Sequence, residues 1–180
     1  MLNDIEKVLI SEKEINDICD RLAAQIEEDY KDKNLVMLCI LKGSILFTAE
    51  LMKRITLPMD VDVMKVSSYG SGTVGSGVIN IHLDILRDDL SECDFLIVED
   101  IIDSGRTLAH LINYLTQKGA RSVRTCTLLD KPSRRIVDLA PDYCGAQIPD
   151  EFVVGFGLDY DEKYRNLPFV GTLKPEVYSK

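Results

Sequence analysis

The stretch Phe95-Leu-Ile-Val-Glu-Asp-Ile-Ile-Asp-Ser-Gly-Arg-Thr-Leu108 passes from an apolar run through two acids into a glycine-containing turn. The continuous apolar residues Phe95–Val98 are typical of a strand that is buried on both faces, as in a parallel sheet. Glu99 and Asp100 then stand at the carboxyl end of this strand, where open α/β sheets place their ligands. The stretch therefore predicts both a fold class and the position of a site.

A helix is expected to follow the turn at Asp103–Thr107 and to start near Ser104. The free N–H groups of its first turn, the missing Cβ of Gly105 and the hydroxyls of Ser104 and Thr107 together suit a phosphate monoester. Arg106 either helps to bind this anion or faces water. An ordinary helix cap on a surface loop uses the same residue types, and the complete ordered string favours the phosphate site. The apolar positions of the helix have helical spacing: Leu108, Leu111, Ile112 and Leu115.

Composition limits the classes of protein to consider. At 180 residues, the chain suits one domain that buries roughly 70% of the surface exposed by its unfolded form. The net charge of −9 argues against nonspecific binding to nucleic acid or acidic membranes, which requires a basic face, but it leaves local basic patches open. Five irregularly spaced cysteines, without a zinc-type spacing or a signal peptide, predict reduced thiols in a cytoplasm. No apolar run reaches the roughly 18 residues of a membrane span.

Further apolar patterns predict the remaining elements. The capping-box sequence Ser11-Glu-Lys-Glu14 begins a helix expected over about residues 11–31, and Gly119 suits the end of the helix that follows the central turn. The stretch Ser67–Gly77, rich in glycine and serine, predicts a mobile loop, whereas residues 133–149 show weak periodicity. The other expected elements are a helix over 45–55 and strands over 35–41, 61–66, 78–83, 122–129, 151–155 and 169–173.

This alternation of strands and helices predicts an α/β fold with a mainly parallel, twisted sheet, right-handed connections and helices on both faces. Three loops should meet at one edge because each follows the carboxyl end of a strand. They are Lys42-Gly43, Glu99–Thr107 and the turn after Leu129. We expect the first helix and the last thirty or so residues to form a smaller lobe above this edge.

The string 95–108 resembles the motif that binds phosphoribosyl diphosphate (PRPP) in type I phosphoribosyltransferases. Along its full length the chain is similar to the hypoxanthine-guanine phosphoribosyltransferase family. The resemblance implies one domain over 1–180, with a hood lobe from about 1–10 and 150–180. It also implies Mg²⁺ as cofactor and a homodimer or homotetramer. The motifs that carry it are Leu41-Lys-Gly43, Ser68-Tyr69, Asp130-Lys-Pro132 and Phe152-Val-Val-Gly155 through Asp159 and Arg165.

The resemblance implies transfer of the 5-phosphoribosyl group from PRPP to N9 of hypoxanthine or guanine, which yields IMP or GMP and pyrophosphate. Glu99 and Asp100 would hold the ribose hydroxyls, directly or through Mg²⁺. Asp159 would be a further Mg²⁺ ligand beside the purine, and a cis peptide bond is implied between Leu41 and Lys42. The full set implied to bind PRPP or nucleotide is Lys42, Gly43, Glu99, Asp100, Asp103, Ser104, Gly105, Arg106, Thr107 and Arg165.

The resemblance also implies how the base is recognised. Phe152 would stack on the purine as a broad apolar plate, Val153 would offer main-chain groups to the base edge, and Lys131 would donate to the 6-oxo group. Asp103 would be the catalytic residue that handles the proton at purine N7. The loop at Ser68-Tyr69 would close as a lid and exclude water. Ser104 and Arg106 depart from the threonine and lysine that are frequent in the family, but keep the hydroxyl and the charge.

Two other readings remain open at this point. A xanthine- or pyrimidine-preferring phosphoribosyltransferase would share the PRPP motif, and Asp103, Lys131 and Phe152 discriminate because a pyrimidine has no N7. A regulator that senses PRPP and binds nucleic acid would keep the same fold. The net charge of −9 and the complete set of acids argue against this regulator.

Overall fold

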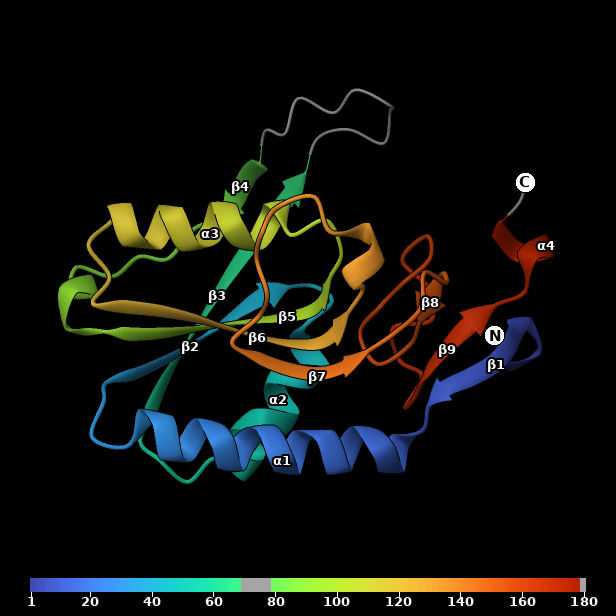
Figure 1. The fold of residues 1–180 in the computed structure, drawn as a ribbon, viewed down its shortest axis with the longest axis horizontal. Helices are drawn as coiled ribbons and strands as arrows, with labels where there is room; N and C mark the ends of the chain where they lie inside the picture. Colours follow the sequence, from blue (N-terminus) through green and yellow to red (C-terminus); the bar gives the residue numbers. More distant parts are fainter. Residues whose placement is uncertain (69–78, 179–180) are drawn as a thin grey trace.

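Two β-sheets of different size organise the chain, which a computed structural model describes over residues 1–68 and 79–178. Within these residues the larger sheet has the strand order β4-β3-β2-β5-β6-β7 and the smaller has the order β1-β9-β8 (Figure 1). The strands are β1 (Ile5–Ile10), β2 (Leu35–Leu41), β3 (Met59–Ser68), β4 (Ile79–Leu83), β5 (Asp94–Ile102), β6 (Ser122–Asp130), β7 (Tyr143–Gln147), β8 (Val153–Val154) and β9 (Val170–Leu173). The helices are α1 (Glu12–Tyr30), α2 (Ile45–Arg54), α3 (Arg106–Gln117) and α4 (Pro175–Tyr178), with short 3-10 helices at Leu2–Asp4, Leu90–Glu92 and Pro132–Arg134.

The larger sheet is mainly parallel, which confirms the predicted fold class. β2 runs parallel to β3 and β5, and β6 runs parallel to β5 and β7, whereas β4 runs antiparallel to β3. α3 covers one face of this sheet, and α1 and α2 cover the other (Figure 1). Each face has its own core: Leu35 and Met37 pack toward α1 and α2, whereas Val36 and Leu38 pack toward α3. A strand with helices on both sides must be apolar on both faces.

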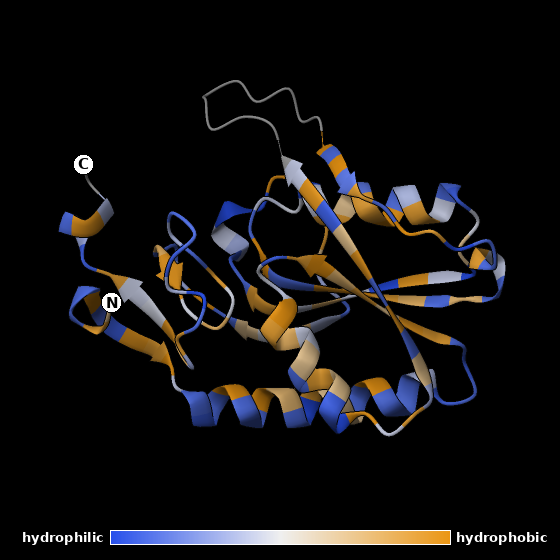
Figure 2. Ribbon diagram, turned by 180° about the vertical axis from the view of Figure 1, so that it is seen from behind, coloured by the Kyte–Doolittle hydropathy of each residue, from blue (hydrophilic) through white to orange (hydrophobic). Residues whose placement is uncertain are grey.

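Hydropathy along the chain follows this two-sided burial. β2 and β5 are mostly hydrophobic, whereas α1 alternates between polar and apolar residues (Figure 2). The predicted capping box of α1 is present: the N–H of Glu14 donates to Ser11 Oγ over 3.3 Å, and the N–H of Ser11 donates to Glu14 Oε2 over 2.8 Å. These bonds satisfy N–H groups that have no partner within the helix. Among the described residues, no helix combines the length and apolar character that a membrane crossing needs.

The first helix packs on the larger sheet and not in the smaller lobe, which corrects our expectation. Ile15, Leu22 and Ile26 on its apolar face are buried in the same core as β2. The strand before the helix, β1, pairs antiparallel with β9, and β9 pairs with β8. An amphipathic helix must bury its apolar stripe, and the larger sheet offers the broader cover. The hood lobe from about 1–10 and 150–180 within a single domain stays a prediction.

Two element boundaries also differ from expectation. α3 begins at Arg106 and not near Ser104, because Gly105 has φ +82°, a left-handed conformation outside the helical range. β7 forms within the weakly periodic segment as the edge strand beside β6, its one neighbour. An edge strand is less buried than a central one, so its sequence shows a weaker apolar pattern. Of the predicted lid, Ser68 ends β3 and Tyr69 lies outside the described residues.

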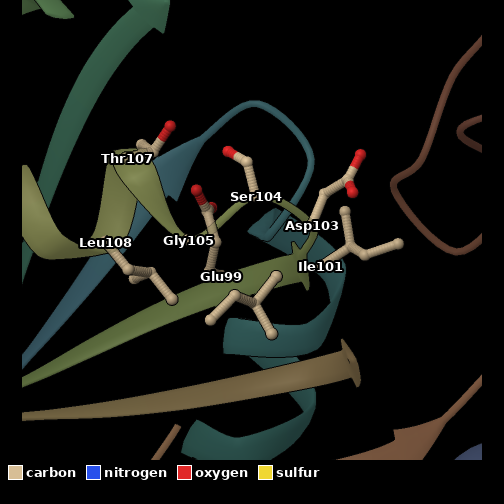
Figure 3. A pocket seen from close by; sticks show the side chains of 8 residues that line it. Glu99, Ile101, Asp103, Ser104, Gly105, Thr107 and Leu108 are labelled. Atoms are coloured by element: carbon tan, nitrogen blue, oxygen red, sulfur yellow. The ribbon is translucent and has the colours of Figure 1, made fainter. Parts of the chain in front are cut away.

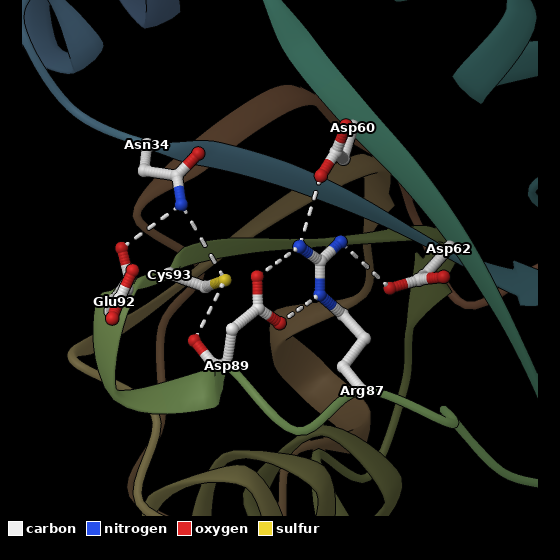
Figure 4. A network of polar contacts seen from close by, with 7 residues as sticks. All are labelled: Asn34, Asp60, Asp62, Arg87, Asp89, Glu92 and Cys93. Carbon is white, nitrogen blue, oxygen red and sulfur yellow. Dashed lines mark hydrogen bonds and ion pairs between the residues drawn. The ribbon is translucent and has the colours of Figure 1, made fainter.

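A polar network at the amino ends of the strands joins the segment after β4 to β3 (Figure 4). The guanidinium of Arg87, whose side chain is largely buried, lies 2.9 Å from Asp60, 2.9 Å from Asp89 and 3.4 Å from Asp62. A charge that is withdrawn from water needs such partners. The network therefore anchors this end of the sheet, away from the carboxyl ends of the parallel strands where the candidate site lies.

Candidate active site

A cleft of about 380 Å³ opens at the carboxyl ends of β2, β3 and β5. Loops from distant parts of the sequence meet here because parallel strands end at the same edge of the sheet. Residues from the start of α3 and from the segment 155–165, which we call the hood loop, complete its walls. The lining residues are Ile40, Leu41, Lys42, Gly43, Val66, Ser67, Glu99, Asp100, Thr107, Asp159 and Arg165.

A smaller cavity of about 80 Å³ lies at the turn between β5 and α3. The hydroxyls of Ser104 and Thr107 and the carboxylate of Asp103 point to the same side of this turn (Figure 3). The left-handed Gly105 precedes α3 directly, so the first N–H groups of the helix lie at the turn as well. Hydroxyls beside the amino end of a helix suit a bound anion. The cavity is lined by Glu99, Ile101, Ile102, Asp103, Ser104, Gly105, Thr107 and Leu108.

The loop after β2 depends on close backbone contacts. The peptide bond between Leu41 and Lys42 is cis, as predicted. A Cβ atom on Gly43 would overlap the carboxylate of Asp100, and a Cβ atom on Gly157 would overlap the carbonyl oxygen of Gly43. Gly157 also has φ +103°, which disfavours other residues. Glycine at both positions therefore lets the acid pair, the loop after β2 and the hood loop approach one another.

Glu99 and Asp100 are two partly buried acids in sequence at the floor of the cleft. Burial raises the pKa of Asp100 to about 6, against the opposing effect of the Ile101 N–H that donates to its Oδ1 over 2.7 Å. Burial, and then the charge of Asp100, raise the pKa of Glu99 well above its ordinary value. Two carboxylates that are short of water resist being ionised together. A cation bound in the cleft would favour the ionised form of both acids.

The pKa of Asp100 leads to a prediction about stability. Its folded value of about 6 exceeds the ordinary value of about 3.9, so the folded state holds this proton more tightly. The contribution of Asp100 to stability should therefore fall as the pH rises from about 4 to about 6. Asp100→Asn should therefore stabilise the ligand-free protein by about 2–3 kcal/mol at pH 7.5.

Thermal unfolding in a chelating buffer at pH 4 and pH 7.5 measures this difference. Asp17→Asn is the matched control because it neutralises a carboxylate on α1 that is 60% exposed. The prediction is wrong if Asp100→Asn gains no stability at pH 7.5 relative to that control, or gains the same amount at pH 4.

The hood loop is joined to the cleft by charged side chains. Arg165 Nη2 lies 2.7 Å from Asp159 Oδ1, and Arg165 Nη1 donates to the carbonyl oxygen of Gly157 over 2.7 Å. Lys42 Nζ lies 2.8 Å from Glu162 Oε2, which joins this loop to the loop after β2. Arg165 Nε is buried without a hydrogen-bond partner among the described residues. These contacts place two cations beside the acids of the cleft.

Phe152 lies outside both cavities, on the side of the smaller sheet. The residue is 42% exposed. Its ring centroid lies 5.3 Å from that of Tyr178, with the rings 23° from parallel, and 5.6 Å from that of Tyr160, edge to face. It lines a third cavity of about 340 Å³ together with Glu151 and Thr172. An aromatic ring with this much exposed surface can still accept a flat partner.

Lys131 and Asp103 approach the region between the two sheets from the larger one. Lys131 is buried, and its Nζ donates to the carbonyl oxygen of Glu151 over 2.6 Å. Asp103 remains half-exposed and lies beside Arg134. These contacts place Asp103 at the end of β5 and Lys131 at the end of β6, beside the residues that precede β8.

Two predicted residues have less direct positions. Arg106 is exposed at the first position of α3. The side chain of Val153 is buried in the core, so only its main chain remains for a ligand. Sequence reasoning missed Gly157 and Glu162 as neighbours of the Lys42-Gly43 loop, and Tyr178 as a neighbour of Phe152. The Gly155-Phe-Gly157 spacing was the one available signal, because two close glycines often mark a tight approach of the backbone.

The fold and the site match known proteins. A sequence model described as the phosphoribosyl transferase domain matches residues 10–161, so the fold and the site define a phosphoribosyltransferase. The chain is 52% identical over 177 residues to a hypoxanthine-guanine phosphoribosyltransferase of Streptococcus pneumoniae, covering 98% of each chain. It is 50% identical over 180 residues to that of Staphylococcus epidermidis, covering 100% of each.

A solved structure supports the similarity to hypoxanthine-guanine phosphoribosyltransferases. The crystal structure of a hypoxanthine phosphoribosyltransferase from Staphylococcus aureus superposes with a TM-score of 0.95 at 49% identity, over 100% of this chain and 97% of that chain. The chain therefore belongs to the hypoxanthine-guanine phosphoribosyltransferase family of purine salvage enzymes.

Proposed function

We propose that the chain transfers the 5-phosphoribosyl group of PRPP to N9 of hypoxanthine or guanine and releases pyrophosphate. The observation that carries this proposal is the single segment from β5 to α3. It holds the acids Glu99 and Asp100, the carboxylate of Asp103 and the anion-binding turn Ser104–Thr107 beside one another at the sheet edge. Ribose, phosphate and base would thus be oriented by one rigid segment.

Each part of the site has a proposed task. The turn Ser104–Thr107, with Gly105 and Arg106 in it, binds the 5′-phosphate. Lys42, Gly43 and Arg165 face the pyrophosphate, and the cleft that all three line supports this assignment. Phe152 stacks on the base.

The edges of the base have their own partners. Lys131 donates to the 6-oxo group, and Val153 and Asp159 border the base. Asp103 accepts the N7 proton as positive character develops in the purine ring.

The acids also fit a magnesium ion. Carboxylate oxygens are hard ligands, and Mg²⁺ is usually held by one or two of them together with water and substrate phosphates. Within residues 1–68 and 79–178, no group of three or more His, Cys, Asp or Glu side chains is arranged to hold a metal by itself. The proposed ligands Glu99, Asp100 and Asp159 would therefore act together with water and the diphosphate oxygens of PRPP. The bound ion would neutralise charge on the diphosphate.

Asp159→Ala tests the metal role. The variant should weaken PRPP and pyrophosphate binding, and the loss should grow as Mg²⁺ is lowered, because a hard oxygen ligand is gone. Titration of PRPP by calorimetry at two Mg²⁺ concentrations measures the effect. Asp161→Ala, which removes an exposed acid two residues away, is the control. Unchanged affinity and unchanged Mg²⁺ dependence would make Asp159 a surface residue that pairs with Arg165.

Pyrophosphate release from PRPP and Mg²⁺, measured separately with hypoxanthine, guanine, xanthine, adenine and uracil, tests the reaction itself. Release with hypoxanthine and guanine is the expected result. Release with xanthine alone or uracil alone would replace the proposed substrate. If the protein binds PRPP but releases no pyrophosphate with any base, the proposed enzymatic activity is wrong and a PRPP-sensing regulator is favoured.

We also propose a homodimer or homotetramer. Apolar side chains on the outer side of α2 and the adjoining part of β3 are 37–51% exposed, which suits contact with a second copy. These residues are Ile45, Leu46, Met52, Val61 and Val63. Light scattering should give a mass of two or four chains for the wild type. Val61→Asp should shift it toward one chain, whereas an unchanged mass would assign the contact elsewhere.

A cytoplasmic location is proposed as well. All five cysteines are free thiols in the structure, and four of them are buried. Burial raises the pKa of the thiols of Cys19, Cys93 and Cys126, which keeps them protonated and unreactive. Unpaired thiols are typical of a reducing compartment.

A further inference from the structure

Two adjacent arginines after β6 contact opposite ends of Asp103. Arg134 Nε lies 3.2 Å from the carboxylate atom Oδ1 of Asp103. Arg135 Nε donates to the main-chain carbonyl oxygen of the same residue over 3.0 Å. The segment that carries the arginines is therefore built against the turn that carries Asp103.

Arg135 is a buried anchor for this turn. Its side chain is 15% exposed. Besides Asp103 it contacts the buried carboxylate of Asp130 and the carbonyl oxygen of Leu139. A Cβ atom on Gly105 would lie 2.9 Å from Arg135 Cδ, so the guanidinium stem fills the space behind the turn. A planar, forked donor with several fixed partners holds its neighbours in one geometry.

The main chain after Arg135 strengthens this attachment. The N–H groups of Ile136 and Val137 both donate to the carbonyl oxygen of Ser104, over 3.0 and 3.2 Å. These bonds occupy the back of the turn. The hydroxyls of Ser104 and Thr107, which line the cavity, do not take part in these bonds (Figure 3).

Arg134 acts on the carboxylate of Asp103 and on a second acid. Its Nη1 lies 3.6 Å from Asp150 Oδ2, and Asp150 Oδ1 lies 4.0 Å from Lys131 Nζ. A chain of alternating charges thus connects the proposed acceptor at N7 with the proposed donor at the 6-oxo group. Arg134 and Asp103 are 55% and 45% exposed, so the pair is weak while water surrounds it. A base bound above it would displace water and strengthen it.

We propose that Arg134 and Arg135 are positioning residues for Asp103. Arg135 fixes the main chain of the turn, and Arg134 turns the carboxylate toward N7 of the base. The inference rests on the proposed function, because it assumes that Asp103 accepts the N7 proton. Neither arginine touches the reacting atoms in this role.

Arg134→Ala tests whether Arg134 orients the carboxylate of Asp103, because this exposed side chain can be removed without unfolding the protein. We expect kcat with hypoxanthine to fall about threefold to fivefold, with Tm and the KM for PRPP unchanged. Arg134→Lys should recover part of the loss. The matched control is Arg124→Ala, since Arg124 forms a similarly exposed pair with Asp29 at 2.7 Å on the distant half of β6. An unaffected kcat in Arg134→Ala overturns this part.

A double-mutant cycle shows whether Arg134 acts through Asp103. In the Asp103→Asn background, Arg134→Ala should cause no further loss of kcat, because no carboxylate remains to be oriented. An equal loss in both backgrounds would assign Arg134 to another task and contradict the proposal.

Arg135→Lys tests the main-chain part. Lysine keeps the charge beside Asp130 but cannot reach all three partners of the guanidinium. We expect a loss of about tenfold or more in kcat, together with a higher KM for PRPP, since the whole turn is displaced. Arg135→Gln, which keeps a planar donor, should lose less PRPP affinity than Arg135→Ala. Wild-type kinetics in Arg135→Lys at an unchanged Tm would overturn this part.

Wild-type activity is measured first in each series. If the wild type shows no phosphoribosyl transfer, the proposed function is wrong. If the wild type is active and both arginine variants keep its kinetics, only the positioning role is wrong.

Discussion

Asp103→Asn is expected to lower kcat by about 10²–10⁴ while it changes PRPP affinity much less. As N9 bonds to C1′, the imidazole ring of the purine gains positive character, and the proton at N7 needs an acceptor. Asparagine keeps the shape of the side chain but cannot take this proton. The turn should stay in place because Arg135 holds it through the carbonyl oxygen of Asp103.

Presteady-state measurement of the chemical step, together with PRPP binding by calorimetry, separates the possible outcomes. A parallel loss of PRPP binding and kcat would give Asp103 a structural role. An unaffected kcat would show that water or another group handles N7. Asp103→Glu is a useful companion because it retains the base and alters its position.

Gly43→Ala is expected to lower kcat/KM for PRPP by about 100-fold, which is the scale of a misplacement of reacting groups by about 1 Å. The added Cβ would overlap the carboxylate of Asp100. Either the carboxylate of Asp100 must rotate away or the strand end and the loop must separate, because the Cβ position lies 1.6 Å from Asp100 Oδ2 and 2.6 Å from its Cγ. In both cases the arrangement of the acid pair and the loop after β2 changes.

Steady-state kinetics with varied PRPP measure this loss, and the matched control is Gly119→Ala. Gly119 has φ +94° with open space around its Cβ position, so alanine there costs stability through the backbone alone. Gly119→Ala should lower Tm and leave kcat/KM unchanged. If Gly43→Ala behaves as this control does, the close contact with Asp100 has no functional importance.

Both results would reflect a site that gives up stability for function. Glu99 and Asp100 are kept side by side with raised pKa values, although separate, solvated acids would cost less. Functional sites often retain groups whose pKa values are shifted by burial and by like charge. The gain in stability expected for Asp100→Asn and the losses in activity expected for the other variants have the same cause, which is the close packing of buried acids and loops at this site.

The sequence by itself determined the parallel sheet, its buried strands and the helix cap at Ser11. It also determined the position of the acids and of the turn at the end of β5. These features depend on neighbours in the chain: apolar runs, helical spacing, a capping box and glycine at a left-handed position. Resemblance to a family supplied the cis peptide bond between Leu41 and Lys42, which no local pattern indicates.

Only the tertiary structure decided which distant segments complete the site. Arg134 and Arg135 reach Asp103 from the end of the neighbouring strand β6, Gly157 meets Gly43, and β1 pairs with β9. The weak periodicity of residues 133–149 concealed both arginines and β7. Such contacts join residues that are far apart in sequence. A single charged residue or glycine produces no repeating pattern in the sequence, so its neighbours in the sequence cannot identify the residue that it contacts in the fold.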